Sequence, residues 1–174
     1  MNLRQHVRSV DDKVFKVLFL CTGNSARSIM AEAILNRMGG GSFHGFSAGS
    51  HPTGEVNAHA LALLRRYDHP VEGLRSKHWS EFASAGGPRV DLVITVCDKA
   101  AAEVCPVWPG QPMSAHWGLP DPAAARGSEA EISRSFSEVY EELSSRLIRL
   151  VDLPVEKLDR PALQSQIAAL GTPA

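Results

Sequence analysis

The chain of 174 residues has few cysteines, almost no excess charge and no long apolar segment. Its three cysteines are odd in number and widely spaced, which argues against structural disulfides and favours reactive thiols in a reducing compartment. The formal net charge is -1 and no basic stripe recurs on a helical face, so nucleic acid is not expected as a partner. No run of about eighteen apolar residues exists, so no membrane span is expected.

The N-terminal residues also lack the apolar stretch of a secretion signal, which predicts a cytoplasmic protein. The length and the 44% hydrophobic content are typical of one domain with a sizeable core. We expect this domain over residues 15–151, preceded by a polar leader, 1–14, and followed by a C-terminal extension, 152–174.

Short apolar runs alternate with segments of helical periodicity along the chain. Strands are predicted over 16–20, 43–47, 91–96 and 113–117, and helices over 28–38, 57–66, 129–151 and 160–170. A short turn is expected over 79–82 and irregular structure over 106–112. This alternation predicts an α/β fold, a four-stranded parallel sheet with helices on both faces.

The segment 21–28, Cys-Thr-Gly-Asn-Ser-Ala-Arg-Ser, leaves the first predicted strand and opens the first predicted helix. Backbone N–H groups of such a loop, with the helix N-terminus, form a cradle for oxyanions. We expect Cys21 to be a nucleophile with a lowered pKa, and Arg27 to hold an oxyanion through its forked donors. Ser28 donates to the thiolate or caps the helix. The loop residues expected to bind the oxyanion are Thr22, Gly23, Asn24, Ser25, Ala26 and Arg27.

Two further segments follow predicted strand ends, where ligands bind in parallel sheets. Cys97 follows the third strand, and the loop after Trp117 carries Asp121 between two prolines that stiffen it. We therefore expect Cys21, Cys97 and this loop to gather on one rim of the sheet. Asp121 either begins a turn or serves as an acid that protonates a departing oxygen. The presence of the oxyanion loop favours the acid role over the turn.

The segment 21–28 resembles the active-site loop of the low-molecular-weight protein tyrosine phosphatases and of the arsenate reductases built on the same fold. Residues 95–110 resemble the cysteine-bearing segment of those reductases, and residues 116–123 resemble their general-acid loop. The resemblance runs from about residue 16 to about residue 150. It implies the low-molecular-weight phosphatase fold and a covalent adduct between Cys21 and the oxyanion.

Two features favour a reductase over a phosphatase. Ala123, Ala124 and Ala125 follow the acid loop, where a phosphatase holding a phosphotyrosine ring needs aromatic walls. Cys97 and Cys105 are redundant for a phosphatase, but a reductase must draw two electrons from thiols. Both cysteines could instead be small packing residues. We therefore expect an arsenate reductase, with a phosphatase, or a module that only binds oxyanions or senses thiols, as the alternatives.

Two departures from the related reductases bear on the electron donor. Ala26 stands where many thioredoxin-coupled members carry another cysteine, and seven residues separate Cys97 from Cys105, one more than in that class. The chain thus looks more like the reductases that use a small thiol, such as glutathione with glutaredoxin, although thioredoxin stays open. We expect no tightly bound cofactor and no metal, although Glu32 and Ser47 loosely match potassium-binding positions of some members.

Overall fold

The computed structural model describes residues 13–172, so most of the predicted leader lies outside the described residues. Within them, four parallel strands form one sheet in the order β2-β1-β3-β4. Their bounds are β1 Phe15–Leu20, β2 Phe43–Ala48, β3 Leu92–Thr95 and β4 Met113–His116. The helices are α1 Arg27–Met38, α2 Ala58–Arg66, α3 Ser80–Ala83, α4 Asp98–Ala102, α5 Glu129–Val151 and α6 Arg160–Leu170, with a 3-10 turn, η1, at Pro122–Ala124.

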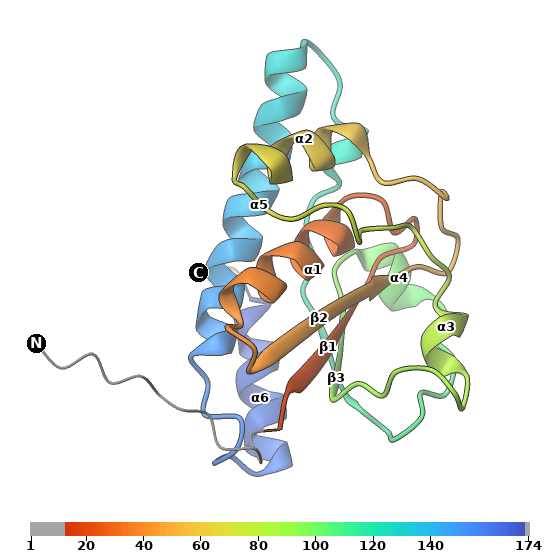
Figure 1. The fold of residues 1–174 in the computed structure, drawn as a ribbon, viewed down its shortest axis with the longest axis vertical. Helices are drawn as coiled ribbons and strands as arrows, with labels where there is room; N and C mark the ends of the chain where they lie inside the picture. Colours follow the sequence, from red (N-terminus) through yellow and green to blue (C-terminus); the bar gives the residue numbers. More distant parts are fainter. Residues whose placement is uncertain (1–12, 173–174) are drawn as a thin grey trace, which may run out of the picture.

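The two faces of the sheet are buried against different elements (Figure 1). Val17 and Phe19 of β1 face a large cluster to which α1, α2, α5 and α6 contribute. Leu18 and Leu20 point the opposite way, toward a smaller cluster that includes Phe82 of α3. Successive side chains of a strand alternate between faces, so a continuous apolar run serves both clusters at once. This confirms the predicted α/β fold with helices on both faces.

The strand register sets the positions of the candidate residues. β1 lies between β2 and β3, with Leu20 opposite both Ala48 and Thr95. Cys21 leaves β1 immediately after this row, and Cys97 follows β3 two residues beyond it. Parallel strands end at the same edge, so residues 76 positions apart in the sequence arrive together there, as expected.

The long helix α5 begins and ends where its sequence predicts. Ser128 caps it and forms a reciprocal capping box with Glu131. Its buried side chains recur at helical spacing, and the helix packs on α1, α2 and α6; these side chains are Phe136, Val139, Leu143, Arg146, Leu147 and Leu150. The sequence did not predict α4 or η1, because helices this short have no periodicity to read.

The C-terminal helix α6 packs beside β4. Leu163, Ile167 and Leu170 belong to the large cluster, and the fully buried Trp117 donates its indole N–H to the carbonyl of Ile167 at 3.0 Å. Residues beyond 151 thus contribute to the same core as the sheet. Among the described residues, none of the helices is long and apolar enough to cross a membrane.

Candidate active site

The loop after β1 turns its carbonyl groups outward and its amides inward. The carbonyls of Thr22, Gly23 and Ser25 accept hydrogen bonds of 2.9–3.0 Å from backbone N–H groups of residues 51–57. In a planar trans peptide, the next N–H points opposite to each carbonyl. The N–H groups of residues 23, 24 and 26 therefore face the interior of the loop, the donor arrangement that an oxyanion requires.

Asn24 fixes the loop from within. It is fully buried with a φ of 44°, a left-handed conformation that asparagine tolerates better than most residues. Its side-chain amide donates to the Ser28 hydroxyl at 2.9 Å, and its side-chain oxygen accepts from the backbone N–H of Lys77 at 2.8 Å. Ser28 thus receives a hydrogen bond and keeps its own proton available. It does not cap α1, which has no side-chain cap.

Arg27 joins the oxyanion loop to the acid loop. Its guanidinium is 13% exposed, donates to the carbonyl of Leu119 at 2.9 Å, and lies 3.7 Å from the carboxylate of Asp121. Asp121 is 46% exposed, and its other oxygen accepts from the N–H of Ala123 and so caps η1. The two readings of Asp121 are therefore compatible, because the residue starts a turn and still holds one carboxylate oxygen beside Arg27.

The thiols of Cys21 and Cys97 are hydrogen-bonded to each other, and both residues are buried. The Cys97 sulfur also accepts from the N–H of Ala100 at 3.3 Å, and the Thr22 hydroxyl lies 3.8 Å from it. These contacts stabilise a negative charge on Cys97. The two thiols are thus close enough to exchange a proton.

The pKa values of this pair differ from the expectation for Cys21. The hydrogen bond from Cys21, and then those from backbone N–H groups, lower the pKa of Cys97 to about 5. The hydrogen bond to Cys97, and then burial, raise the pKa of Cys21, although Arg27 opposes this. The prediction of a lowered pKa for Cys21 is therefore wrong for the free enzyme. The pair carries one negative charge at neutral pH, and transfer of one proton from Cys21 to Cys97 would place that charge on the Cys21 sulfur.

Cys105 is exposed, in contrast to the other two cysteines. The pKa of its thiol is raised by partial burial and by Glu103. Val104 and Val107, on either side of it, are 94% and 90% exposed. Glu103 accepts a hydrogen bond of 3.0 Å from the hydroxyl of Thr22, so this segment contacts the oxyanion loop. The sequence analysis missed Glu103, since its partner is 81 residues away.

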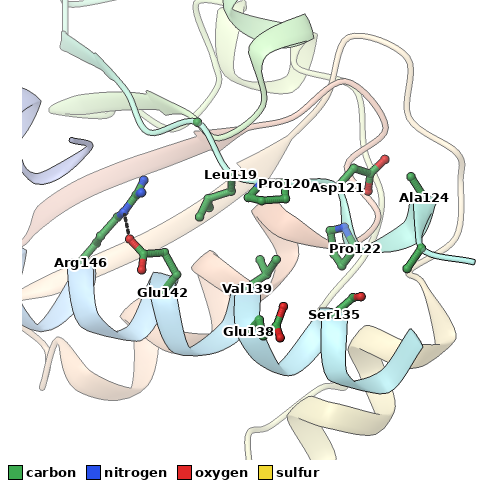
Figure 2. Close-up of a pocket in the computed structure, with 12 residues that line it drawn as sticks. Leu119, Pro120, Asp121, Pro122, Ala124, Ser135, Glu138, Val139, Glu142 and Arg146 are labelled. Atoms are coloured by element: carbon green, nitrogen blue, oxygen red, sulfur yellow. Dashed lines mark hydrogen bonds and ion pairs between the residues drawn. The ribbon is translucent and has the colours of Figure 1, made fainter. Parts of the chain in front are cut away.

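A cavity of about 760 Å³ lies between the acid loop and α5 (Figure 2). Asp121, Pro122 and Ala124 lie along one side, and Glu138, Glu142 and Arg146 lie along the other. None of the residues that line it carries an aromatic ring. The wall beyond the acid thus offers no stacking surface, as the run of three alanines predicts. Within residues 13–172, no cluster of three or more His, Cys, Asp or Glu side chains could hold a metal ion.

The fold and site have clear relatives. The family model for low molecular weight phosphotyrosine protein phosphatases matches residues 16–163. An arsenate reductase of Bacillus licheniformis is 35% identical over 137 residues, covering 78% of this chain and 94% of that protein. A solved arsenate reductase in its phosphate-binding state has a TM-score of 0.65 at 27% identity, covering 79% of this chain and 97% of that one.

A thioredoxin-dependent arsenate reductase of Corynebacterium glutamicum has a TM-score of 0.57 at 26% identity. The match covers 81% of this chain and 62% of that longer one. The fold and the oxyanion loop define an enzyme with a cysteine nucleophile on an α/β sheet. The chain belongs to the low molecular weight phosphotyrosine protein phosphatase family, and its curated relatives at about this identity are arsenate reductases.

Proposed function

We propose that this protein is an arsenate reductase that uses Cys21, Cys97 and Cys105 in turn. The observation that carries the proposal is the contact between the Cys21 and Cys97 thiols at the oxyanion loop. A phosphatase needs one thiol there, because its covalent intermediate is hydrolysed. A reductase needs a second thiol within reach, because each turnover removes two electrons from sulfur.

The first step forms a bond between Cys21 and arsenic. Arsenate lies in the loop against the inward N–H groups and Arg27, and the Cys21 proton passes to Cys97. The Cys21 sulfur attacks arsenic, and one arsenate oxygen leaves as water once protonated. Asp121, beside Arg27, supplies that proton, so arsenic remains As(V) in a thioester-like adduct.

The second step reduces arsenic. Cys97 first gives the proton that it took from Cys21 to an oxygen on arsenic, and the resulting Cys97 thiolate attacks the Cys21 sulfur and forms a Cys21–Cys97 disulfide. The electron pair of the broken sulfur–arsenic bond stays on arsenic, which leaves as As(III), arsenite. Two thiols have then each lost one electron, which balances the two electrons gained by arsenic.

The third step passes the disulfide outward. Cys105 attacks Cys97 and frees Cys21, and a thiol from outside then reduces the resulting Cys97–Cys105 bond. The exposure of Cys105 supports this role, because a donor can reach it without entering the core. The exposed Val104 and Val107 would suit a protein donor, whereas Ala26 and the seven-residue spacing favour a small thiol such as glutathione with glutaredoxin. Repeated reduction of these thiols suits the cytoplasm.

Replacing Asp121 by Asn should lower turnover by ~10²–10⁴-fold, the usual effect of losing a general acid. Because Asp121 donates a proton during turnover, the rate of the wild type should fall toward basic pH. The variant should lose this fall and show a flat basic limb. Steady-state rates of arsenate reduction across pH measure both effects. An unchanged pH profile would reject the acid role, and Asp152→Asn provides a control for a change of charge elsewhere.

Replacing Cys105 by Ser should slow steady-state reduction but leave a single turnover intact. After one turnover without added thiol, peptide mapping should find a Cys21–Cys97 disulfide in this variant and a Cys97–Cys105 disulfide in the wild type. Cys97→Ser should stop earlier, before any arsenite forms. If Cys105→Ser turns over normally, or if only a mixed disulfide of Cys21 with external thiol forms, the internal relay is wrong.

Arsenate-dependent oxidation of a thiol supply tests the function as a whole. The enzyme should be assayed in parallel with glutathione and glutaredoxin, with thioredoxin, and with a mycothiol-type system, each with phosphate in place of arsenate as the blank. Reduction with any donor supports the proposal. Release of phosphate from an aryl phosphate without arsenate reduction would identify a phosphatase. Oxyanion binding with neither activity would identify a binding or thiol-sensing module.

A further inference from the structure

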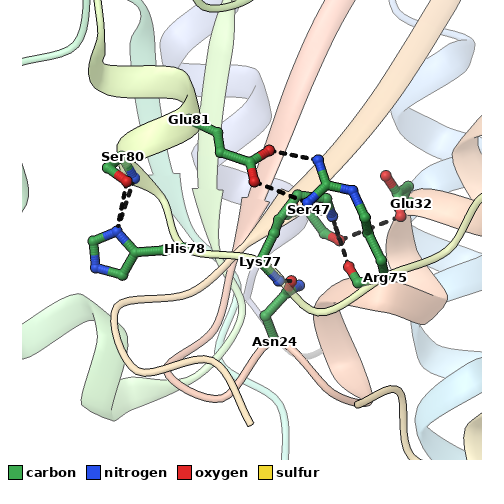
Figure 3. A network of polar contacts seen from close by, with 8 residues as sticks. All are labelled: Asn24, Glu32, Ser47, Arg75, Lys77, His78, Ser80 and Glu81. Carbon is green, nitrogen blue, oxygen red and sulfur yellow. Dashed lines mark hydrogen bonds and ion pairs between the residues drawn. The ribbon is translucent and has the colours of Figure 1, made fainter. Parts of the chain in front are cut away.

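Lys77 is a buried lysine directly behind the oxyanion loop. It is 9% exposed, and its ammonium donates to the carbonyls of Ser47 at 2.7 Å and Arg75 at 2.9 Å. The hydroxyl of Ser47 lies 3.5 Å away as a third acceptor. Carbonyl oxygens only accept hydrogen bonds, so this set of oxygens matches the three donors of a protonated amine. Figure 3 shows the ammonium between β2 and the segment that carries Arg75.

The charge that faces Lys77 is Glu32 of α1. Its carboxylate is buried and accepts from the Ser47 hydroxyl at 3.3 Å, so Ser47 lies between the two charged groups. Burial raises the pKa of Glu32 and lowers that of Lys77, and each charge opposes the shift of the other. A buried carboxylate without a nearby cation is very costly, so the ammonium of Lys77 favours the ionised form of Glu32.

The main chain of Lys77 connects these two charged side chains to the loop. Its N–H donates to the side-chain oxygen of Asn24 at 2.8 Å, and its carbonyl accepts from the N–H of Gly49 at 3.0 Å. Gly49 packs against the loop backbone, since a Cβ there would lie 2.6 Å from the carbonyl oxygen of Cys21. One residue thus fixes the loop through its backbone and places a positive charge behind it.

We propose that Lys77 is a positioning residue that tunes the affinity of the loop for oxyanions by neutralising Glu32 and holding Asn24. Without its ammonium, the buried charge nearest the back of the loop would be the Glu32 carboxylate, which repels arsenate. The inference concerns the same site as the proposed arsenate reduction and rests on it, but its test needs only binding. Phosphate and sulfate have the same tetrahedral shape, so they report on the loop whether or not arsenate is reduced.

The test compares phosphate affinity among charge variants of the full-length protein by isothermal titration. Lys77→Met keeps the length of the side chain and removes its charge, and should weaken phosphate binding by at least ~10-fold, as coupled sites commonly do. Glu32→Gln should bind phosphate more tightly than the wild type. The double variant should return close to the wild type. Lys157→Met is the matched control, because it makes the same replacement at an exposed lysine after α5, away from the oxyanion loop.

Binding within twofold of the wild type in a folded Lys77→Met variant would overturn the proposal. If Lys77→Met does not fold, the comparison of Glu32→Gln with the Lys77→Met, Glu32→Gln double variant tests the proposal instead. The double variant should fold, since it contains neither of the two buried charges. Equal phosphate affinity in these two variants would show that the Lys77 charge has no effect on the loop. A failure of all variants, including the wild type, to bind phosphate would instead refute the oxyanion site itself.

Rescue of phosphate binding by added cations distinguishes the charge of the Lys77 side chain from its packing. Lys77→Ala leaves a space lined by the oxygens of Ser47 and Arg75, which suits a small cation. Methylammonium chloride should restore much of the phosphate affinity, whereas tetramethylammonium chloride at the same ionic strength should not, because it is too large and has no N–H donors. Equal recovery with both salts, or none with either, would indicate that Lys77 only fills space.

Discussion

Replacing Cys21 by Ser is expected to abolish arsenate reduction, with a loss of ~10⁴-fold or more, as the removal of a covalent nucleophile causes in other enzymes. Two physical reasons act together. A serine hydroxyl is far less acidic than a thiol, so Cys97 cannot deprotonate it as it deprotonates Cys21. Oxygen also cannot form the disulfide through which arsenic gains its electrons. The fold should survive, because the two side chains have almost the same shape.

The measurement is arsenite formed per enzyme in a single turnover, with circular dichroism to verify the fold. Cys105→Ser, the same replacement at an exposed thiol, is the control and should still complete that turnover. In the wild type, alkylation of the Cys21–Cys97 pair should follow a midpoint near pH 5, because the thiolate charge of the pair forms as the pH rises through the lowered pKa of Cys97. A midpoint near ~8.5, the value of a free thiol, or turnover by Cys21→Ser, would contradict the assignment.

Replacing Arg27 by Lys should lower the efficiency of arsenate reduction by ~10²–10³-fold, the scale for losing an oxyanion-binding donor. The positive charge remains, but lysine cannot hold two oxygens in one plane or bridge to the acid loop as Arg27 does. Both the oxyanion and Asp121 would then lose their fixed positions. The affinity for arsenate and the rate of the chemical step should both fall, since the guanidinium contacts the oxyanion before and during attack.

The ratio of kcat to KM for arsenate measures this loss, and phosphate affinity measures its binding component. Arg65→Lys, on the exposed face of α2, is the control and should behave as the wild type. Wild-type kinetics in Arg27→Lys would mean that the guanidinium faces the acid loop alone and takes no part in holding arsenate.

The local sequence was enough to locate the loop and the sheet. The apolar run before Cys21 and the helical pattern after Arg27 are short-range features, so the strand, loop and helix could be predicted from neighbouring residues. The same holds for Ser128 and Glu131, whose capping box begins α5. The rule that parallel strands end at one edge was enough to predict that Cys97 and the acid loop meet Cys21.

Only the tertiary structure shows how the residues that meet at this edge of the sheet interact. The contact between Cys21 and Cys97 depends on β1 and β3 being neighbours and on the register of Leu20 opposite Thr95. That contact reversed the expected pKa of Cys21, since a hydrogen bond between two thiols outweighs the general positive potential of the loop. No pattern near Cys21 could reveal that its thiol forms a hydrogen bond with a thiol 76 residues away.

Lys77 is the clearest case of the same limit. A single lysine in a polar segment is usually solvated, so nothing in its local sequence marked it as buried. The sequence determined the reactive groups of this protein: the thiols, the guanidinium, the carboxylate and the glycine-containing loop. The tertiary structure decided which of them share a proton and which charge lies behind the loop, because burial and the partners of a charge are set by segments that are distant in the sequence.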